Sequence, residues 1–330
     1  MDSNIIASPI LVEDSADQSI LLFLYLFEAL ILLGALSLNI LLLCVLKKYL
    51  VFHIHLNIIC INLTLAVLIA IIFLLLRVVY QMLQILTNPM SRISMPMNEI
   101  FIPLCQQDLS FPPHLSVLFF TLPLFLIIER YYATRRFCRY EEESCPGFIK
   151  FVCFAMWTPF VLHSLYSFAS LNFPQILIPC DLAQVKSAQR NVWNIFAGVF
   201  CLLFSILFKF MEQENQRCEA DYVQNHYTTI SIRFQIKENV KTCGFFVSMN
   251  LLFAIAFLSN LFFDKQVLEI DRFSNSNANI RREFSHFVFP LLSLGYAFHF
   301  ITSHPQLLQK AKILMRKFTR NGPENEKLGV

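Results

Sequence analysis

The fold is decided by residues 109–136, which read LSFPPHLSVLFFTLPLFLII over 109–128 and ERYYATRR over 129–136. The first twenty residues carry no charged side chain, whereas the last eight bring Glu129, Arg130, Arg135 and Arg136. At 1.5 Å per residue, about twenty apolar residues are what a helix needs to cross a hydrocarbon core of roughly 30 Å. The basic cluster then marks the cytoplasmic end of this helix. The segment therefore predicts a membrane-spanning helix.

The composition supports the same interpretation for the whole chain. Of 330 residues, 56% are hydrophobic, 15% are charged and 35 are Phe. Soluble domains usually carry about 25% charged residues, and long apolar runs exposed to water would cause aggregation. The fold class we expect is all-α: a polytopic membrane protein built as a bundle of helices.

Seven apolar runs divide the chain. They are residues 19–46, 55–76, 109–128, 151–178, 191–208, 242–263 and 284–301. Lys47 and Lys48 close the first run, and Arg77 closes the second. Glu28 is the only carboxylate well inside a run, and we interpret it as a protonated or snorkelling group rather than as a counter-ion. The expected organisation is an N-terminal tail over 1–18, a seven-transmembrane domain over 19–304 and a tail over 305–330.

The orientation follows from the distribution of cations among the loops. Of the 26 Lys and Arg residues, 18 fall in segments 47–54, 130–150 and 209–241 and in the tail from residue 304. Because cytoplasmic loops are enriched in Lys and Arg, this asymmetry predicts an extracellular N-terminus and a cytoplasmic C-terminus.

The tail contains a segment with two distinct helical faces. One face is apolar and the other is basic. The apolar residues are Leu307, Leu308, Ala311, Leu314, Met315 and Phe318, and the basic residues are Lys310, Lys312, Arg316, Lys317 and Arg320. Such a helix is expected to lie at the membrane interface, on the inner leaflet.

Glu129-Arg130-Tyr131 resembles the Asp/Glu-Arg-Tyr signature that ends the third helix of G-protein-coupled receptors. The resemblance implies that Glu129 holds Arg130 at rest and that Arg130 is freed to meet the carbonyls of a G-protein helix end. The alternative is ordinary basic flanking of a membrane helix. Before the sixth run, Arg233 and Lys237 are four residues apart and share a helix face. That face is either a further G-protein contact or a solvated extension of the helix.

Two cysteines, Cys105 and Cys180, fall on the expected extracellular side, which is the oxidising one. Cys105 precedes Arg130 by 25 residues, a separation that resembles rhodopsin-like receptors. The resemblance implies a disulfide that fastens the second outer loop over the bundle, and the alternative is two unpaired cysteines. The rhodopsin-like Asn-Pro-x-x-Tyr motif is absent, and His304-Pro305 is the nearest sequence to it.

Three motifs in the inner loops together resemble nematode serpentine chemoreceptors, most closely class epsilon, over about residues 20–310. They are FHIHLN at 52–57, the ER and AT pairs at 129–134 with Tyr140-Glu141, and SIRFQIKEN at 231–239. The family implies a G-protein-coupled chemosensory receptor that binds an odorant or pheromone-like small molecule and a heterotrimeric G protein. It also implies the plasma membrane, and sensory cilia in particular, as the location.

Polar and aromatic residues in the outer half of the expected bundle are the candidate ligand contacts, because polar groups inside a membrane normally face the bundle interior. An ordinary interhelical hydrogen bond or a packed core ring is the alternative for each. The candidates are His163, Tyr166 and Ser170 in the fourth run, and Phe253, Phe257 and Asn260 in the sixth.

The chain contains no metalloprotease helix motif, no nucleophile elbow and no Gly-rich phosphate loop. We therefore expect no enzymatic activity, no cofactor, no metal site and no nucleic-acid partner. The alternative function is a ligand-gated ion channel or an insect-type odorant receptor. A channel of either kind would show the opposite orientation or a repeated polar stripe lining a pore.

Overall fold

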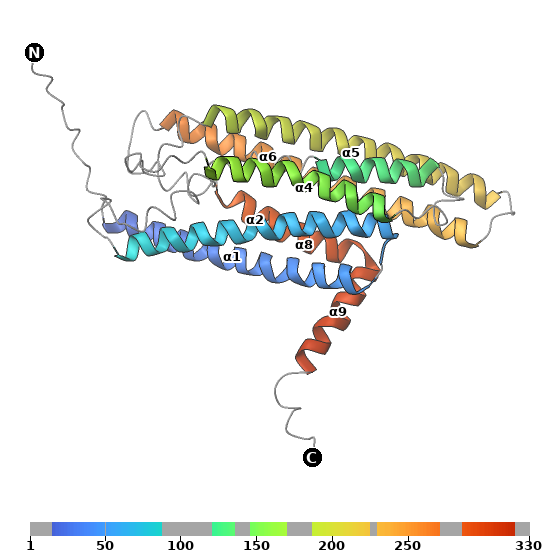
Figure 1. Ribbon diagram of the computed structural model, residues 1–330, viewed down its shortest axis with the longest axis horizontal. Coiled ribbons are helices and arrows are strands. Elements are labelled where there is room, and N and C mark those ends of the chain that lie inside the picture. Colours follow the sequence, from blue (N-terminus) through green and yellow to red (C-terminus); the bar gives the residue numbers. More distant parts are fainter. Residues whose placement is uncertain are drawn as a thin grey trace, which may run out of the picture.

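The computed structural model describes residues 15–49, 51–87, 121–135, 146–169, 187–224, 230–270 and 286–320 (Figure 1). Nearly all of these residues are helical, and no strand occurs among them. The expectations for Cys105, Cys180 and Ser170 concern residues outside these ranges.

Seven helices have defined bounds in this part of the chain, and residues 121–135 form a further helical segment, called here the third helix. The bounds are α1 Ser15–Lys48, α2 Ile54–Thr87, α4 Pro146–Ala169, α5 Ser187–Gln224, α6 Ile230–Ile270, α8 Val288–Ser303 and α9 Pro305–Arg320. Four stretches are long and apolar enough to cross a membrane: Ser19–Lys48, Ile54–Leu83, Asn194–Asp221 and Gln235–Ser259. Helix α8 is apolar but shorter.

These helices are apolar on both the inward and the outward face. In α1 the side chains of Leu32, Ala35 and Leu42 are fully buried, whereas Phe23 and Leu30 are each 67% exposed. A helix that is apolar all round fits a lipid environment, because lipid solvates the outward side chains and the helix itself satisfies the backbone hydrogen bonds.

The helices run roughly along one long axis, and α9 leaves the bundle at an angle at one end (Figure 1). Helix α1 packs against α2 and α8, α5 packs against α6, and α6 packs against α8. The core between them is largely aliphatic and aromatic. A stacked pair formed by Phe253 and Tyr296 joins α6 to α8, with 6.0 Å between the ring centroids.

Two helices extend well beyond the expected runs. Helix α5 continues to Gln224, although the run ends at residue 208, and α6 begins at Ile230, although the run begins at residue 242. Charged residues in these extensions do not end the helices, because they occupy exposed positions such as Lys209, Arg217 and Lys237. The run boundaries therefore mark changes in polarity and not helix ends.

The interpretation of Glu28 as a protonated or snorkelling group was wrong, as was the placement of Arg77 at the end of a span. Helix α2 continues for ten residues beyond Arg77, and the guanidinium Nη2 of Arg77 donates to both carboxylate oxygens of Glu28, at 2.8 and 3.0 Å. Both side chains are buried. The two residues form an ion pair between α1 and α2, in the half of the bundle farther from Lys48.

His304 separates α8 from α9. Its backbone is extended, with φ −112° and ψ 111°, as expected for a residue before proline, and Pro305 begins the next helix. Leu307, Ala311 and Leu314 on the apolar face of α9 are buried, and α9 contacts α1 and α8. The predicted amphipathic helix is confirmed, although the buried part of its apolar face packs on the bundle. Met315 is 46% exposed and stays available to the membrane interface.

Candidate functional site

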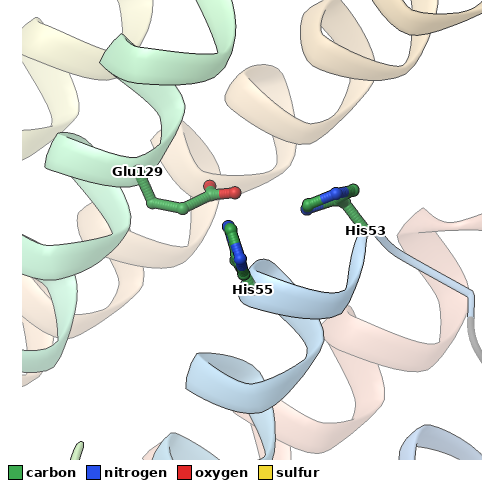
Figure 2. A group of neighbouring side chains, drawn as sticks. All are labelled: His53, His55 and Glu129. Atoms are coloured by element: carbon green, nitrogen blue, oxygen red, sulfur yellow. The ribbon is translucent and has the colours of Figure 1, made fainter. Parts of the chain in front are cut away.

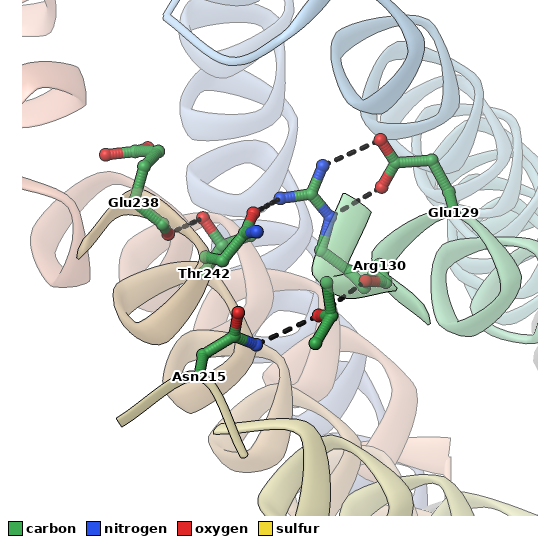
Figure 3. Close-up of polar contacts among 7 residues, drawn as sticks. Glu129, Arg130, Asn215, Glu238 and Thr242 are labelled. Carbon is green, nitrogen blue, oxygen red and sulfur yellow. Dashed lines mark hydrogen bonds and ion pairs between the residues drawn. The ribbon is translucent and has the colours of Figure 1, made fainter. Parts of the chain in front are cut away.

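The buried charge cluster at one end of the bundle is centred on Arg130 (Figure 3). Its Nε donates to Oε2 of Glu129 at 2.5 Å, and its Nη2 donates to Oε1 of the same carboxylate at 2.6 Å. The Nη1 group donates to Oδ1 of Asn239 in α6 at 2.8 Å. Only 2% of the Arg130 surface and 6% of the Glu129 surface is exposed. The third helix is therefore joined to α6 through a guanidinium that is shielded from water.

A second polar contact joins the third helix to α5. The Thr134 hydroxyl donates to the backbone carbonyl of Arg130 at 2.8 Å and accepts from Nδ2 of Asn215 at 2.9 Å. Thr134 and Asn215 are buried, and the same Nδ2 also donates to the carbonyl of Met211 at 2.7 Å. Thr134 therefore links Arg130 and α5 within one turn of the third helix.

A third contact joins α6 to the junction of α8 and α9. The Nε2 atom of His304 lies 3.0 Å from Oε1 of Glu238, one residue before Asn239, and the Thr242 hydroxyl donates to the Glu238 carbonyl at 2.7 Å. The His304 ring also packs edge-on against Phe52, at 5.0 Å between centroids. Neighbouring residues of α6 thus hold both Arg130 and the start of α9.

We call these three contacts the clasp: Arg130 with Glu129 and Asn239, Thr134 with Asn215, and Glu238 with His304. Charge-assisted hydrogen bonds of a buried guanidinium are strong, but removing the ions from water costs free energy. Such clusters therefore contribute little net stability to the fold, while they fix a specific geometry. Rotation or translation of α6 breaks the bond between Arg130 and Asn239 but leaves the Glu129 pair within the third helix intact. The arrangement is therefore suited to a two-state contact between helices.

The other residues predicted to contact a G protein are on the surface. Tyr131 is 55% exposed and stacks with Arg135, whose Cζ lies 5.7 Å from the ring centroid. Arg233 and Lys237 are both exposed on α6, and Nζ of Lys237 lies 3.9 Å from Oε1 of Glu219 in α5. The five residues predicted to contact a G protein therefore lie in two environments: Glu129 and Arg130 are buried, and Tyr131, Arg233 and Lys237 are accessible.

Two of the six candidate ligand contacts have described side chains. Phe253 and Phe257 are each 1% exposed, and Phe257 packs edge-on against Phe289 with 6.1 Å between centroids. Both rings form part of the core between α6 and α8. His163 and Tyr166 lie in α4 and Asn260 in α6, but their side chains, like Ser170, lie outside the part of the chain whose burial is described.

Sequence reasoning missed five members of the clasp as functional residues: Thr134, Asn215, Glu238, Asn239 and His304. The available signal was the position of Glu238 and Asn239 at the end of the motif over 231–239, next to the apolar run of α6. An amide at such a boundary is compatible with solvent exposure, so only the packed structure shows that Asn239 is 5% exposed and bonded to Arg130.

A sequence model of a protein family, described as serpentine type 7TM GPCR receptor class ab chemoreceptor, matches residues 10–317. No protein of curated function matches the chain. The match covers nearly the whole chain and includes the clasp. Together with the apolar helices, it confirms the predicted all-α, seven-transmembrane bundle. The matched class is ab, so the closer resemblance to class epsilon is not confirmed.

Proposed function

Because the chain belongs to the serpentine seven-transmembrane chemoreceptors, a family of membrane receptors and not of enzymes, we propose that it couples a small ligand to a heterotrimeric G protein through the clasp. The proposed ligand is a largely apolar odorant or pheromone-like molecule, and the proposed location is the plasma membrane of sensory cilia. The N-terminus is extracellular and the C-terminus cytoplasmic in this proposal, which places the clasp on the cytoplasmic side.

The observation that carries the proposal is the bond between Arg130 and Asn239. In the closed arrangement, Glu129 and Asn239 occupy three donor groups of the guanidinium. When α6 moves away from the third helix, Nη1 loses its acceptor and the guanidinium becomes able to meet the carbonyl groups at the end of a G-protein helix. Tyr131, Arg233 and Lys237 then supply the accessible surface around it.

Helix α6 also provides the route from the ligand to the clasp. Phe253 lies fourteen residues after Asn239 and Phe257 eighteen residues after it, which correspond to about 21 and 27 Å along the helix. A ligand in the half of the bundle near these rings can favour the open state only if it binds that state more tightly. We assign this role to Phe253, Phe257 and the other four predicted ligand contacts, His163, Tyr166, Ser170 and Asn260.

The competing function is a ligand-gated channel, and the clasp distinguishes the two. A channel needs a path for ions but has no need for a guanidinium that is exposed on helix movement. The membrane-spanning side chains that contact one another across helices in the described core are mostly apolar and aromatic. This apolar core offers no support for an ion path among the described residues, whereas the receptor function gives the polar contacts of the clasp a role.

A ligand screen with a nucleotide-exchange readout tests the proposal. We expect an agonist to stimulate exchange on a G protein in membranes containing the wild-type protein. Arg130→Ala should abolish that stimulation while ligand binding and surface expression persist. Ligand-gated current in excised patches lacking G proteins, with Arg130→Ala indistinguishable from wild type, would replace the receptor with the channel.

A further inference from the structure

Two histidines converge on the carboxylate of Glu129 (Figure 2). His53 precedes α2 and His55 lies in its first turn, whereas Glu129 comes from the third helix. One potential ligand atom of each residue lies within 4.8 Å of those of the other two. His55 and Glu129 are buried, and His53 is half-buried. Figure 2 shows the Glu129 carboxylate directed toward the gap between the two imidazole rings.

We propose that His53, His55 and Glu129 form a binding site for a divalent transition metal ion such as Zn²⁺. Two imidazoles and one carboxylate are a known zinc ligand set that leaves a fourth position for water. Imidazole ligands favour Zn²⁺, Cu²⁺ and Ni²⁺ over Mg²⁺ and Ca²⁺, which prefer oxygen. The sequence predicts no metal site, because it contains no known metal-binding motif. The His-x-His pair and Glu129 are more than seventy residues apart in the chain, so no local spacing marks this cluster.

Metal binding requires only a small movement of the three ligand atoms. Bonds of about 2.1 Å in a tetrahedral site place ligand atoms roughly 3.4 Å apart. The ligand atoms therefore need to approach one another by at most about 1.4 Å. His53 lies outside a helix and is half-buried, so its side chain can supply much of that movement.

The site shares Glu129 with the clasp. The same two carboxylate oxygens accept from Nε and Nη2 of Arg130. A dication bound to Glu129 repels the guanidinium and competes for the oxygen lone pairs. Metal binding therefore favours release of Arg130 from Glu129, in addition to the release from Asn239 that movement of α6 brings, and by linkage the arrangement with Arg130 free of both residues binds the metal more tightly. This second consequence rests on the proposed function, whereas the metal site itself does not.

Cobalt titration of the purified full-length protein in detergent tests the site. Accessible thiols are first blocked with N-ethylmaleimide, because the ten cysteines offer competing ligands. We expect saturable Co²⁺ d–d absorption bands without sulfur charge-transfer bands, and reversal by Zn²⁺. Loss of a residue that only hydrogen-bonds a metal ligand typically lowers metal affinity by about 10–100-fold. Loss of a ligand should lower it at least as much, so His53→Ala and His55→Ala should each weaken Co²⁺ binding by about tenfold or more.

His299→Gln is the matched control, since His299 is a histidine of α8 that bonds Ser303, stacks on Phe245 and is not one of the three clustered residues. It should bind Co²⁺ as wild type does. Absence of binding by wild type, or unchanged binding by His53→Ala, overturns the metal site whether or not the protein couples to a G protein. If the site binds metal but Zn²⁺ leaves agonist-free nucleotide exchange unchanged, the link to Arg130 is refuted.

Discussion

The Nη1 group of Arg130 lies 2.8 Å from Oδ1 of Asn239, and both side chains are buried. This bond joins the third helix to α6 through two residues that are 109 positions apart in the chain. Glu129 lies beside Arg130 in the same helix, so the Glu129 pair alone cannot hold α6 in place. Asn239 is therefore the residue whose removal tests the closed state most directly.

Asn239→Ala should raise agonist-free signalling. A hydrogen bond to a charged group contributes about 1.5–3 kcal/mol, which corresponds to a shift of about 10–150-fold toward the open arrangement. Agonist-free nucleotide exchange, normalised to the amount of receptor at the surface, measures this shift. Ser248→Ala is the control on the same helix, because Ser248 is exposed and donates only to the carbonyl of Gly244, at 3.4 Å. Equal exchange by Asn239→Ala and wild type would show that this bond does not restrain α6.

The ion pair between Glu28 and Arg77 should stabilise the bundle only as a pair. Glu28→Leu leaves a buried guanidinium without its carboxylate, and loss of one partner of a buried pair costs about 3–5 kcal/mol. We expect a lower thermal stability in detergent for Glu28→Leu and for Arg77→Leu. The double variant Glu28→Leu/Arg77→Leu should recover most of the loss, because apolar replacement of both partners is often neutral.

Lys209→Leu provides the surface control for this prediction. Lys209 pairs with Glu212 at 2.9 Å but is 54% exposed, and an exposed pair contributes only about 0–1 kcal/mol. The structural account of Glu28 fails if the double variant is less stable than both single variants.

Much of the fold was predictable because membrane helices are recognised by composition. A run of about twenty apolar residues allows few alternatives in lipid, where the helix is the simplest way to pair every backbone group. The predicted runs lie on helices in each described part of the chain. Helix ends were less predictable, because Lys209 and Lys241 border apolar runs without ending α5 or α6.

The pairing of polar residues was not predictable, because it depends on which helices are neighbours. Glu28 and Arg77 are 49 residues apart, and the sequence alone placed one inside a span and the other at its edge. Hydropathy counts each residue separately, whereas a buried ion pair stabilises two charges together. Glu129 and Arg130 were identified because they are adjacent, and Asn239 was missed because its partner lies on another helix.

Acceptor sites for N-glycosylation inserted in each loop should map the orientation. The excess of Lys and Arg in the segments around 47–54, 130–150 and 209–241 predicts that these segments are cytoplasmic and not modified. Acceptors in the tail before residue 19 should be modified, and acceptors after residue 304 should not. The reverse pattern would place the clasp outside the cell and would end the proposal that it meets a G protein.

Cys105 and Cys180 should form a disulfide, if the orientation is as proposed. Six cysteines in the described part of the chain are free thiols, namely Cys44, Cys60, Cys153, Cys201, Cys218 and Cys243. Peptide mapping without reduction should recover the peptides of Cys105 and Cys180 as one linked species. Replacement of either cysteine by Ser should lower surface expression, and the double variant should be no worse than the single variants. Alkylation of both thiols in intact cells without reduction would contradict the pairing.

Arg130→Lys should impair signalling although it keeps the positive charge. The guanidinium donates two hydrogen bonds to Glu129 and one to Asn239, and its planar fork fixes their directions. A lysine ammonium is a compact charge that cannot reproduce the parallel pair to one carboxylate and also reach α6 in the same geometry. Binding of the open state to the G protein should weaken as well, because one ammonium can donate to fewer carbonyls of a G-protein helix end than a guanidinium can.

Agonist-stimulated nucleotide exchange by Arg130→Lys should therefore fall toward that of Arg130→Ala, while agonist-free exchange rises less than in Asn239→Ala. Arg217→Lys is the matched control: it makes the same exchange of Arg for Lys, but at a side chain of α5 that is 76% exposed and whose Nη1 lies 4.0 Å from a single carboxylate oxygen of Glu214. Exposed pairs of this kind contribute little, so this variant should signal as wild type does. Full stimulation of Arg130→Lys would mean that only the charge of Arg130 matters and that the directed hydrogen bonds to Glu129 and Asn239 have no part in switching.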